Sequence, residues 1–136
     1  MSINEVVIDT ELADPTKNPD EEFLYVDISS IDNKNGAIIS YKRLRGAEAP
    51  SRARKRIREN DIIVSTVRPN LNATALVPKE LDNQICSTGF CVLRSNGRVI
   101  PGYLYYYTRT PAFIKSLMTK VKVLLIQQCR QKMLNE

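Results

Sequence analysis

The sequence predicts an α+β fold in which a curled, mostly antiparallel sheet is flanked by helices. Up to Arg94, short runs rich in β-branched and aromatic residues alternate with turn signals, which is typical of strands. From Pro101 onward the apolar residues follow a helical spacing instead. A chain of 136 residues with 43% hydrophobic residues fits one domain with its own core.

The first strands are expected to be joined by tight turns. Val6–Ile8 is a short apolar patch suited to a sheet edge, and turn formers fill the loop at 14–20. Apolar and polar residues alternate within Phe23–Ile31, which predicts a strand. Asn35–Gly36 favours a tight hairpin, and the returning strand is expected over Ala37–Leu44.

The middle of the chain is expected to hold one short helix and several strands. Ser51 is suited to cap a helix that ends near Ile57. The continuous apolar run Ile62–Val67 predicts a buried strand. A strand-like stretch over 84–94 contains Gly89, which we interpret as a bulge or a close backbone approach. A further strand is expected at 73–77, with loops at 46–50, 69–72, 78–83 and 95–97.

Two helices are expected at the end of this pattern. Pro101 suits the first turn of a helix that runs to about Tyr107, and Thr110 suits the cap of a second helix that continues to about Val121. Four of the residues in 103–107 are tyrosines. They suit either stacking on nucleobases or core packing, and the helical spacing favours the core.

Composition excludes several classes of function. Histidine is absent, which removes His-based triads and most zinc sites. No apolar run approaches the ~20 residues of a membrane span, and the first residues do not resemble a signal peptide, so we expect a cytoplasmic protein with no membrane partner. Cys86 and Cys91 are expected to be buried apolar residues. If they share one strand, their odd spacing points them to opposite faces, where they cannot bridge.

Charge is concentrated in one stretch. Lys42–Arg58 holds eight basic residues and one acid, whereas residues 1–41 hold nine acids and two bases. An acidic front beside a strongly basic centre indicates either a side that faces a polyanion such as nucleic acid or an ordinary solvated face. Six of the eight cations are arginines, whose planar fork suits phosphates and guanine edges.

One enzymatic pattern is present in outline. Asp20, Asp32 and Lys34 have the order of a metal-dependent nuclease core, in which carboxylates hold magnesium. However, Asp32 and Lys34 fall in the expected hairpin turn, where such residues serve the backbone. The nuclease therefore stays a remote alternative, and the sequence contains no glycine-rich phosphate loop.

Four strings in a fixed order carry a resemblance to a known family, over about residues 1–122: Tyr25–Ile31, Glu48–Arg54, Asp61–Pro69 and Ser87–Arg94. On these strings the chain resembles a target recognition domain from the DNA-specificity subunit of type I restriction–modification systems. The resemblance implies a curled sheet flanked by helices that reads one half of a bipartite DNA site. It also implies that the domain itself has no catalytic activity and needs no cofactor.

Catalysis would then belong to partner subunits. The resemblance implies a modification subunit that methylates adenine with S-adenosylmethionine, and a restriction subunit that cuts DNA with ATP. Only one recognition domain is present and the family's long spacer helix is missing, so a truncated fragment that acts as a decoy or has no function is the main alternative. A homodimer stays open.

We expect DNA contacts from cations and amides beside turns and loops. Arg52, Arg54 and Arg68 suit either phosphate contact or internal pairing with the acidic front. Val26, Ile28, Ile62 and Val64 are expected in the core, and Asp61 could cap a turn. The candidate DNA-binding residues are Lys42, Arg43, Arg45, Arg52, Arg54, Lys55, Arg68, Asn70 and Asn72.

The tail at 123–136 departs from the resemblance, whose continuation runs close to Gly-Ala-Ser-Tyr-Pro-Ala. Codons that encode Lys122–Cys129 can be chosen so that a shifted frame spells Gly-Ala-Ser-Tyr-Pro-Ala-Met. We therefore expect a recognition domain at 1–122 and a tail that we interpret as out-of-frame translation, with few core contacts.

Overall fold

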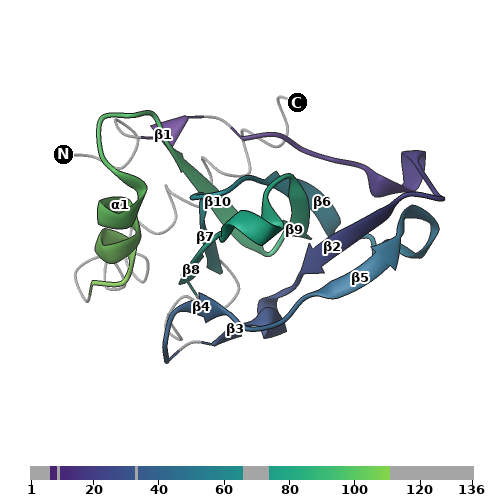
Figure 1. Cartoon of the computed structure of the whole chain (residues 1–136), viewed down its shortest axis with the longest axis horizontal. Coiled ribbons are helices and arrows are strands. Elements are labelled where there is room, and N and C mark those ends of the chain that lie inside the picture. Colours follow the sequence, from purple (N-terminus) through teal and green to yellow (C-terminus); the bar gives the residue numbers. More distant parts are fainter. Residues whose placement is uncertain (1–6, 9, 33, 66–73, 111–136) are drawn as a thin grey trace.

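The computed structural model describes residues 7–8, 10–32, 34–65 and 74–110. In these residues the strands form two four-stranded sheets and one two-stranded sheet (Figure 1). The strand order is β1-β10-β7-β8 in the first sheet, β5-β2-β9-β6 in the second and β3-β4 in the third. All but one of the strand pairings in these sheets are antiparallel.

The first sheet is built around β7 (Ile62–Ser65), in which every residue is buried. It pairs antiparallel with β10 (Phe90–Ser95) and with β8 (Thr74–Leu76). β1 (Val7–Ile8) closes one edge by pairing with β10. The buried strand predicted from the apolar run and the predicted edge strand near the N-terminus are both confirmed.

The second sheet carries six of the eight basic residues of Lys42–Arg58. β2 (Glu22–Val26) lies between β5 (Lys42–Arg45), which is antiparallel, and β9 (Gln84–Ser87), which is parallel. β6 (Ala53–Ile57) pairs antiparallel with the other side of β9. The stretch predicted as one strand is divided into β9 and β10, which belong to different sheets, and the turn at Gly89 joins them.

The helix predicted from Ser51 to Ile57 is wrong, because these residues contribute the strand β6. Burial along β6 alternates: Ala53, Lys55 and Ile57 are buried, while Arg54 and Arg56 are half-buried. This is the period of two expected for a strand. The alternation was hidden in the sequence because the buried residue at the centre of the strand is a lysine.

Two long strands of the prediction are broken. After β2, the Asp27 carboxylate accepts a hydrogen bond from Ser29 N at 3.0 Å and starts a 3₁₀ helix over Ile28–Ser30. β3 (Ile31–Asp32) and β4 (Ala37–Ile38) then form the predicted hairpin, with Gly36 at a φ of +63°. The expected returning strand is therefore split into β4 and β5, which lie in different sheets.

The predicted helix at Pro101 is confirmed as α1 (Pro101–Thr108), with Pro101 in its first turn. Core packing of its tyrosines is wrong for three of them: Tyr103 is 62%, Tyr106 is 72% and Tyr107 is 39% exposed. The helix buries Leu104 and Thr108 instead, and the half-buried Tyr105 donates from its hydroxyl to Gly36 O at 2.6 Å. The predicted helix that follows Thr110 lies outside the described residues.

The main core lies between the sheets. Its buried side chains come from β2, β6, β7, β8, β9 and β10 and include Val26, Ile57, Ile63 and Phe90. Cys86 is 0% and Cys91 is 1% exposed, which confirms the prediction that both are buried, although they lie on different strands. Ile62 and Val64 are buried as expected, whereas Ile28 only packs against the core. The α+β fold with mostly antiparallel sheets is confirmed.

Candidate nucleic-acid interface

β5 is an edge strand of the second sheet with no strand paired to its outer side among the described residues, and its three cations, Lys42, Arg43 and Arg45, are exposed. Arg43 lies 3.5 Å from Glu22 in a pair whose side chains are 71% and 54% exposed. Such exposed pairs contribute little to stability, since water screens both charges. β5 therefore presents cations that solvent or a ligand can reach.

A shallow cleft of about 460 Å³ lies beside β5 and mixes basic, acidic, polar and apolar side chains. Burial of the Tyr25 phenol raises its pKa, and a hydrogen bond with Ser87 opposes that shift. The exposed Arg52 and Lys42 both line the cleft. The lining residues are Tyr25, Asp27, Lys42, Leu44, Glu48, Pro50, Ser51 and Arg52.

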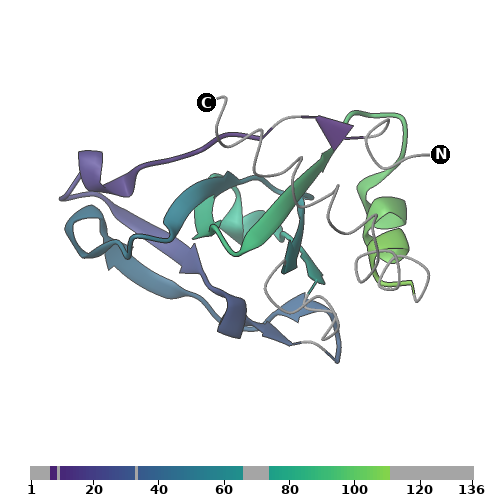
Figure 2. The same ribbon diagram turned by 180° about the vertical axis from the view of Figure 1, so that it is seen from behind.

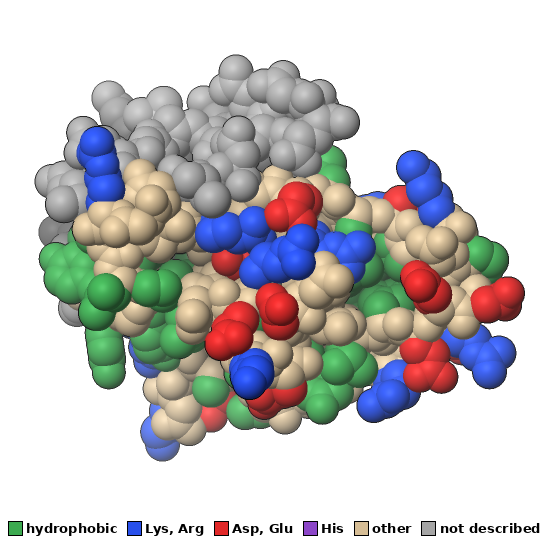
Figure 3. Space-filling view, turned by 45° about the horizontal axis from the view of Figure 1, so that its top comes forward, with side chains coloured by type: hydrophobic (Ala, Val, Ile, Leu, Met, Phe, Trp, Pro, Cys, Tyr) green, Lys and Arg blue, Asp and Glu red, His purple; other side chains and the backbone are tan. Residues whose placement is uncertain are grey.

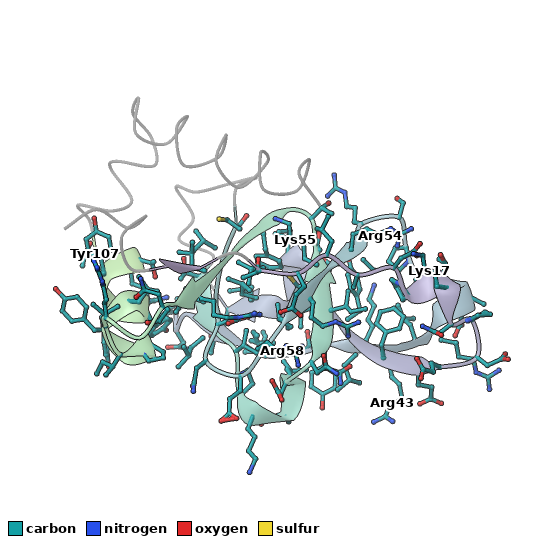
Figure 4. The ribbon with its side chains drawn as sticks, turned by 90° about the horizontal axis from the view of Figure 1, so that it is seen from above. Lys17, Arg43, Arg54, Lys55, Arg58 and Tyr107 are labelled. Atoms are coloured by element: carbon teal, nitrogen blue, oxygen red, sulfur yellow. The ribbon has the colours of Figure 1, made fainter. Side chains whose placement is uncertain are left out.

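The candidates on β6 are placed differently. Lys55 is 6% exposed, and its ammonium donates to Phe90 O at 2.6 Å. Burial lowers the Lys55 pKa, because desolvation penalises the charged form. Figure 4 shows Lys55 within the body of the ribbon and Arg43 at its outer side. Lys55 is therefore withdrawn as a candidate DNA contact.

Arg54 is also engaged within the fold. Its guanidinium donates to Ala53 O at 3.0 Å and lies 3.8 Å from the Asp14 carboxylate. A hydrogen bond from the Thr16 hydroxyl is the main reason that the pKa of Asp14 is lowered. Of the two roles expected for Arg54, the structure shows the internal pairing with the acidic front.

An ion-pair cluster joins the acidic front to the end of the basic stretch. Asp61, which is 1% exposed, accepts two hydrogen bonds from Arg94, both at 2.8 Å, and one from Arg58 N at 2.9 Å. Glu11 pairs with Arg94 at 2.8 Å and with Arg58 at 3.1 Å. The hydrogen bond from Arg94 is the largest cause of the lowered pKa of Glu11. The expected capping role of Asp61 is confirmed through its bond to Arg58 N, and Arg94 binds the same carboxylate.

The N-terminal segment also closes the outer edge of β6 (Figure 2). Ala13 N donates to Arg54 O at 2.8 Å, Arg56 N donates to Glu11 O at 3.1 Å, and Leu12 bridges to Lys55. Acidic and basic side chains accordingly lie next to one another across the middle of the face in Figure 3. The charges of Arg54, Arg58 and Arg94 are therefore largely neutralised by carboxylates of the same chain.

The remaining candidates, Arg68, Asn70 and Asn72, lie outside the described residues. The nuclease outline finds no support around Asp32, whose carboxylate accepts hydrogen bonds from Lys34 N at 3.0 Å and from the Asn35 amide at 2.6 Å. Within residues 7–8, 10–32, 34–65 and 74–110, no group of three or more His, Cys, Asp or Glu could hold a metal ion. In the same residues, no helix is long and apolar enough to span a membrane.

Two exposed apolar residues beside the cations of β5 were not predicted from the sequence. Ile39 is 66% and Tyr41 is 46% exposed. The only signal was an aromatic residue directly before Lys42 and Arg43, and aromatic residues interleaved with cations are typical of nucleic-acid surfaces.

Comparison with known proteins gives the chain a family context. No protein-family model matches the sequence. Over 59 residues, or 43% of this chain and 13% of the relative, it is 34% identical to the type I restriction enzyme HindI specificity subunit of Haemophilus influenzae. The HsdS subunit from Thermoanaerobacter tengcongensis superposes with a TM-score of 0.85 and 50% identity, over 87% of this chain and 30% of that one.

A second solved structure, described as the basis of complex assembly and conformational transition of the type I R-M system, gives a TM-score of 0.86 and 49% identity over 88% of this chain. The chain is similar to one domain of these type I specificity subunits. It spans 30% and 31% of the two solved chains. The fold predicted for a target recognition domain is therefore confirmed.

Proposed function

We propose that this chain is a non-catalytic target recognition module that binds duplex DNA and reads one half of a bipartite site. The observation that carries the proposal is the likeness to the solved HsdS subunit, at 50% identity over 87% of the chain. This likeness favours DNA recognition over the nuclease alternative.

The exposed cations of β5 and of the turn before β6 support a DNA-facing side. Lys42, Arg45 and Arg52 are exposed, and Arg43 takes part only in an exposed pair. We assign these four residues to phosphates, because cations on an accessible edge fix a protein on the DNA backbone. Arg68, Asn70 and Asn72 remain proposed contacts on sequence grounds, with the two asparagines suited to adenine edges.

We further propose that modification and restriction subunits supply the catalysis when the domain is part of an assembled system. The support is the second solved relative, which is described in terms of complex assembly of the type I system. The domain would then position partners on DNA without reacting itself.

Fluorescence anisotropy of labelled duplexes tests DNA binding directly. We expect a Kd on the order of 10⁻⁴–10⁻⁶ M near physiological salt, rising steeply as salt is added. No binding even at low salt would refute the proposal and favour the decoy alternative. Magnesium-dependent cleavage of plasmid DNA that is abolished by Asp20→Asn would instead support the nuclease.

A further inference from the structure

Two large apolar side chains lie exposed on a segment whose backbone is fixed. Ile39 and Tyr41 are 66% and 46% exposed in the connection from β4 to β5, along the lower edge of the molecule in Figure 1. Ile39 N donates to Ser30 O at 2.9 Å, and the preceding Ile38 packs against the main core. The fold therefore holds this segment in place without burying either side chain.

Cations predominate in the sequence around these two residues. The run 34–45 contains four cations and no acid, namely Lys34, Lys42, Arg43 and Arg45. Glu22 pairs with one of the four, across 3.5 Å in an exposed pair. A second copy of the same segment would bring like charges together, which disfavours it as the occupant. A polyanion is complementary to this surface.

Among polyanions, duplex DNA offers both of the chemistries that the segment presents. Phosphates along the strand attract cations, while base edges, including the thymine methyl group, lie in the groove and accept apolar contacts. Four extended residues reach at most ~13 Å, so Ile39 and Arg43 are separated by no more than about the ~12 Å width of the major groove.

We propose that Ile39 and Tyr41 contact base edges in a groove of duplex DNA, while Lys42 and Arg43 hold the adjacent phosphates. The two apolar residues are then specificity-determining residues of the domain. This inference rests on the proposed function and adds to it the side chains that read sequence.

Selection from a pool of randomised duplexes tests this assignment with the full 136-residue chain. The retained duplexes are sequenced for the parent, Ile39→Ala and Tyr41→Ala. We expect each variant to lose preference at one or more base positions by about tenfold. The salt dependence of binding should stay unchanged, because every cation assigned to a phosphate is still present.

Matched controls are available at the start of α1. Ile100 and Tyr103 are 73% and 62% exposed, so Ile100→Ala and Tyr103→Ala remove the same side chains from similarly exposed sites. Both controls should select the parent motif. Arg43→Ala should keep that motif while its salt slope falls by about 0.9. Thermal unfolding of every variant checks that the fold is intact.

Each outcome decides the inference. If Ile39→Ala and Tyr41→Ala select the parent motif unchanged, these residues do not read bases and the inference is wrong. If the parent binds duplexes but selects no motif, base reading by this segment is also wrong, whereas the proposed DNA binding stands. If the parent binds no duplex at any salt concentration, the proposed function fails, and the inference fails with it.

Discussion

β5 and β6 each contain three cations, yet the structure uses them in opposite ways. On β5, Lys42, Arg43 and Arg45 are all exposed at an edge of the sheet. On β6, Lys55 is buried, Arg54 lies beside an acid, and Arg56 donates to Asn83 O at 2.8 Å. The two strands close opposite sides of the same sheet.

The difference comes from what covers each strand. The segment around Leu12 lies against the outer edge of β6 and contributes the carboxylates of Glu11 and Asp14. No described segment pairs with the outer edge of β5. Local charge in the sequence therefore predicts that a strand is basic, whereas the path of the chain decides whether its cations face solvent.

The largest expected effect is a loss of stability at the ion pairs near β6. Asp61→Asn should reduce the free energy of unfolding by about 3 kcal/mol, because it leaves the Arg94 guanidinium without its main counter-charge in a largely buried site. Urea denaturation measures the change. The matched control is Glu22→Gln, which breaks the exposed pair with Arg43 and should cost at most about 0.5 kcal/mol. Equal losses in the two variants would remove the distinction between the two sides.

DNA binding should respond on the β5 side instead. Replacing Arg43, Arg45 and Arg52 with alanine should weaken binding and reduce the salt slope by about 0.9 for each phosphate that is no longer neutralised, or about 2.7 in total. Arg54→Ala should leave the slope unchanged, because Arg54 pairs with Asp14. Binding titrations at several salt concentrations measure both. A triple variant that behaves like the parent would show that the assigned face is wrong.

Lys55 gives a smaller effect that depends on pH. Its pKa is lowered by burial from the ordinary value of 10.5, so the unfolded chain binds more protons between the lowered pKa and 10.5. The free energy of unfolding should therefore rise with pH across that window. Lys55→Met removes the titrating group and should change stability by only about 1 kcal/mol at neutral pH. Urea denaturation from neutral pH to 10.5 should show this rise in the parent and a flatter profile in the variant, and parallel profiles would contradict the assignment.

The smallest expected effect concerns the tail at 123–136, which we propose is translated out of frame. Its deletion should change the free energy of unfolding by less than about 0.5 kcal/mol. It should also leave the salt slope of DNA binding unchanged, which would attribute that slope to the rest of the chain. The nucleotide sequence of the gene provides the independent check: if no shifted frame after Lys122 encodes a continuation of the relatives' sequence, the proposal fails.

Much of the fold could be predicted because its signals are local. The apolar run of β7, the Asn35–Gly36 turn and Pro101 in the first turn of α1 each specify structure within a few residues. β6 could not be predicted in this way, because burial of Lys55 depends on Phe90 O, 35 residues further along the chain. Ser51, a residue suited to cap a helix, therefore led to the prediction of a helix over these residues.

The exposure of the candidate DNA-binding residues could not be predicted from the sequence, for the same physical reason. Sequence alone found the basic stretch, but exposure separates Arg45 from Lys55 and is set by neighbours distant in the chain. The tyrosines of α1 show the converse. Their helix was correctly predicted, yet only Leu104 and Thr108 of that helix are fully buried, so helical spacing did not reveal which face the fold would cover.

The edge position of β5 has a consequence for how the protein behaves in solution. An edge strand offers unpaired backbone groups to any other strand, and edge-to-edge pairing of such strands is a route to aggregation. Three of the four residues of β5 are cations, so two copies that approach through this edge repel each other. The cations assigned to phosphate binding are therefore also expected to oppose edge-to-edge association of two copies. Neutralising these cations is expected to promote self-association in the absence of DNA.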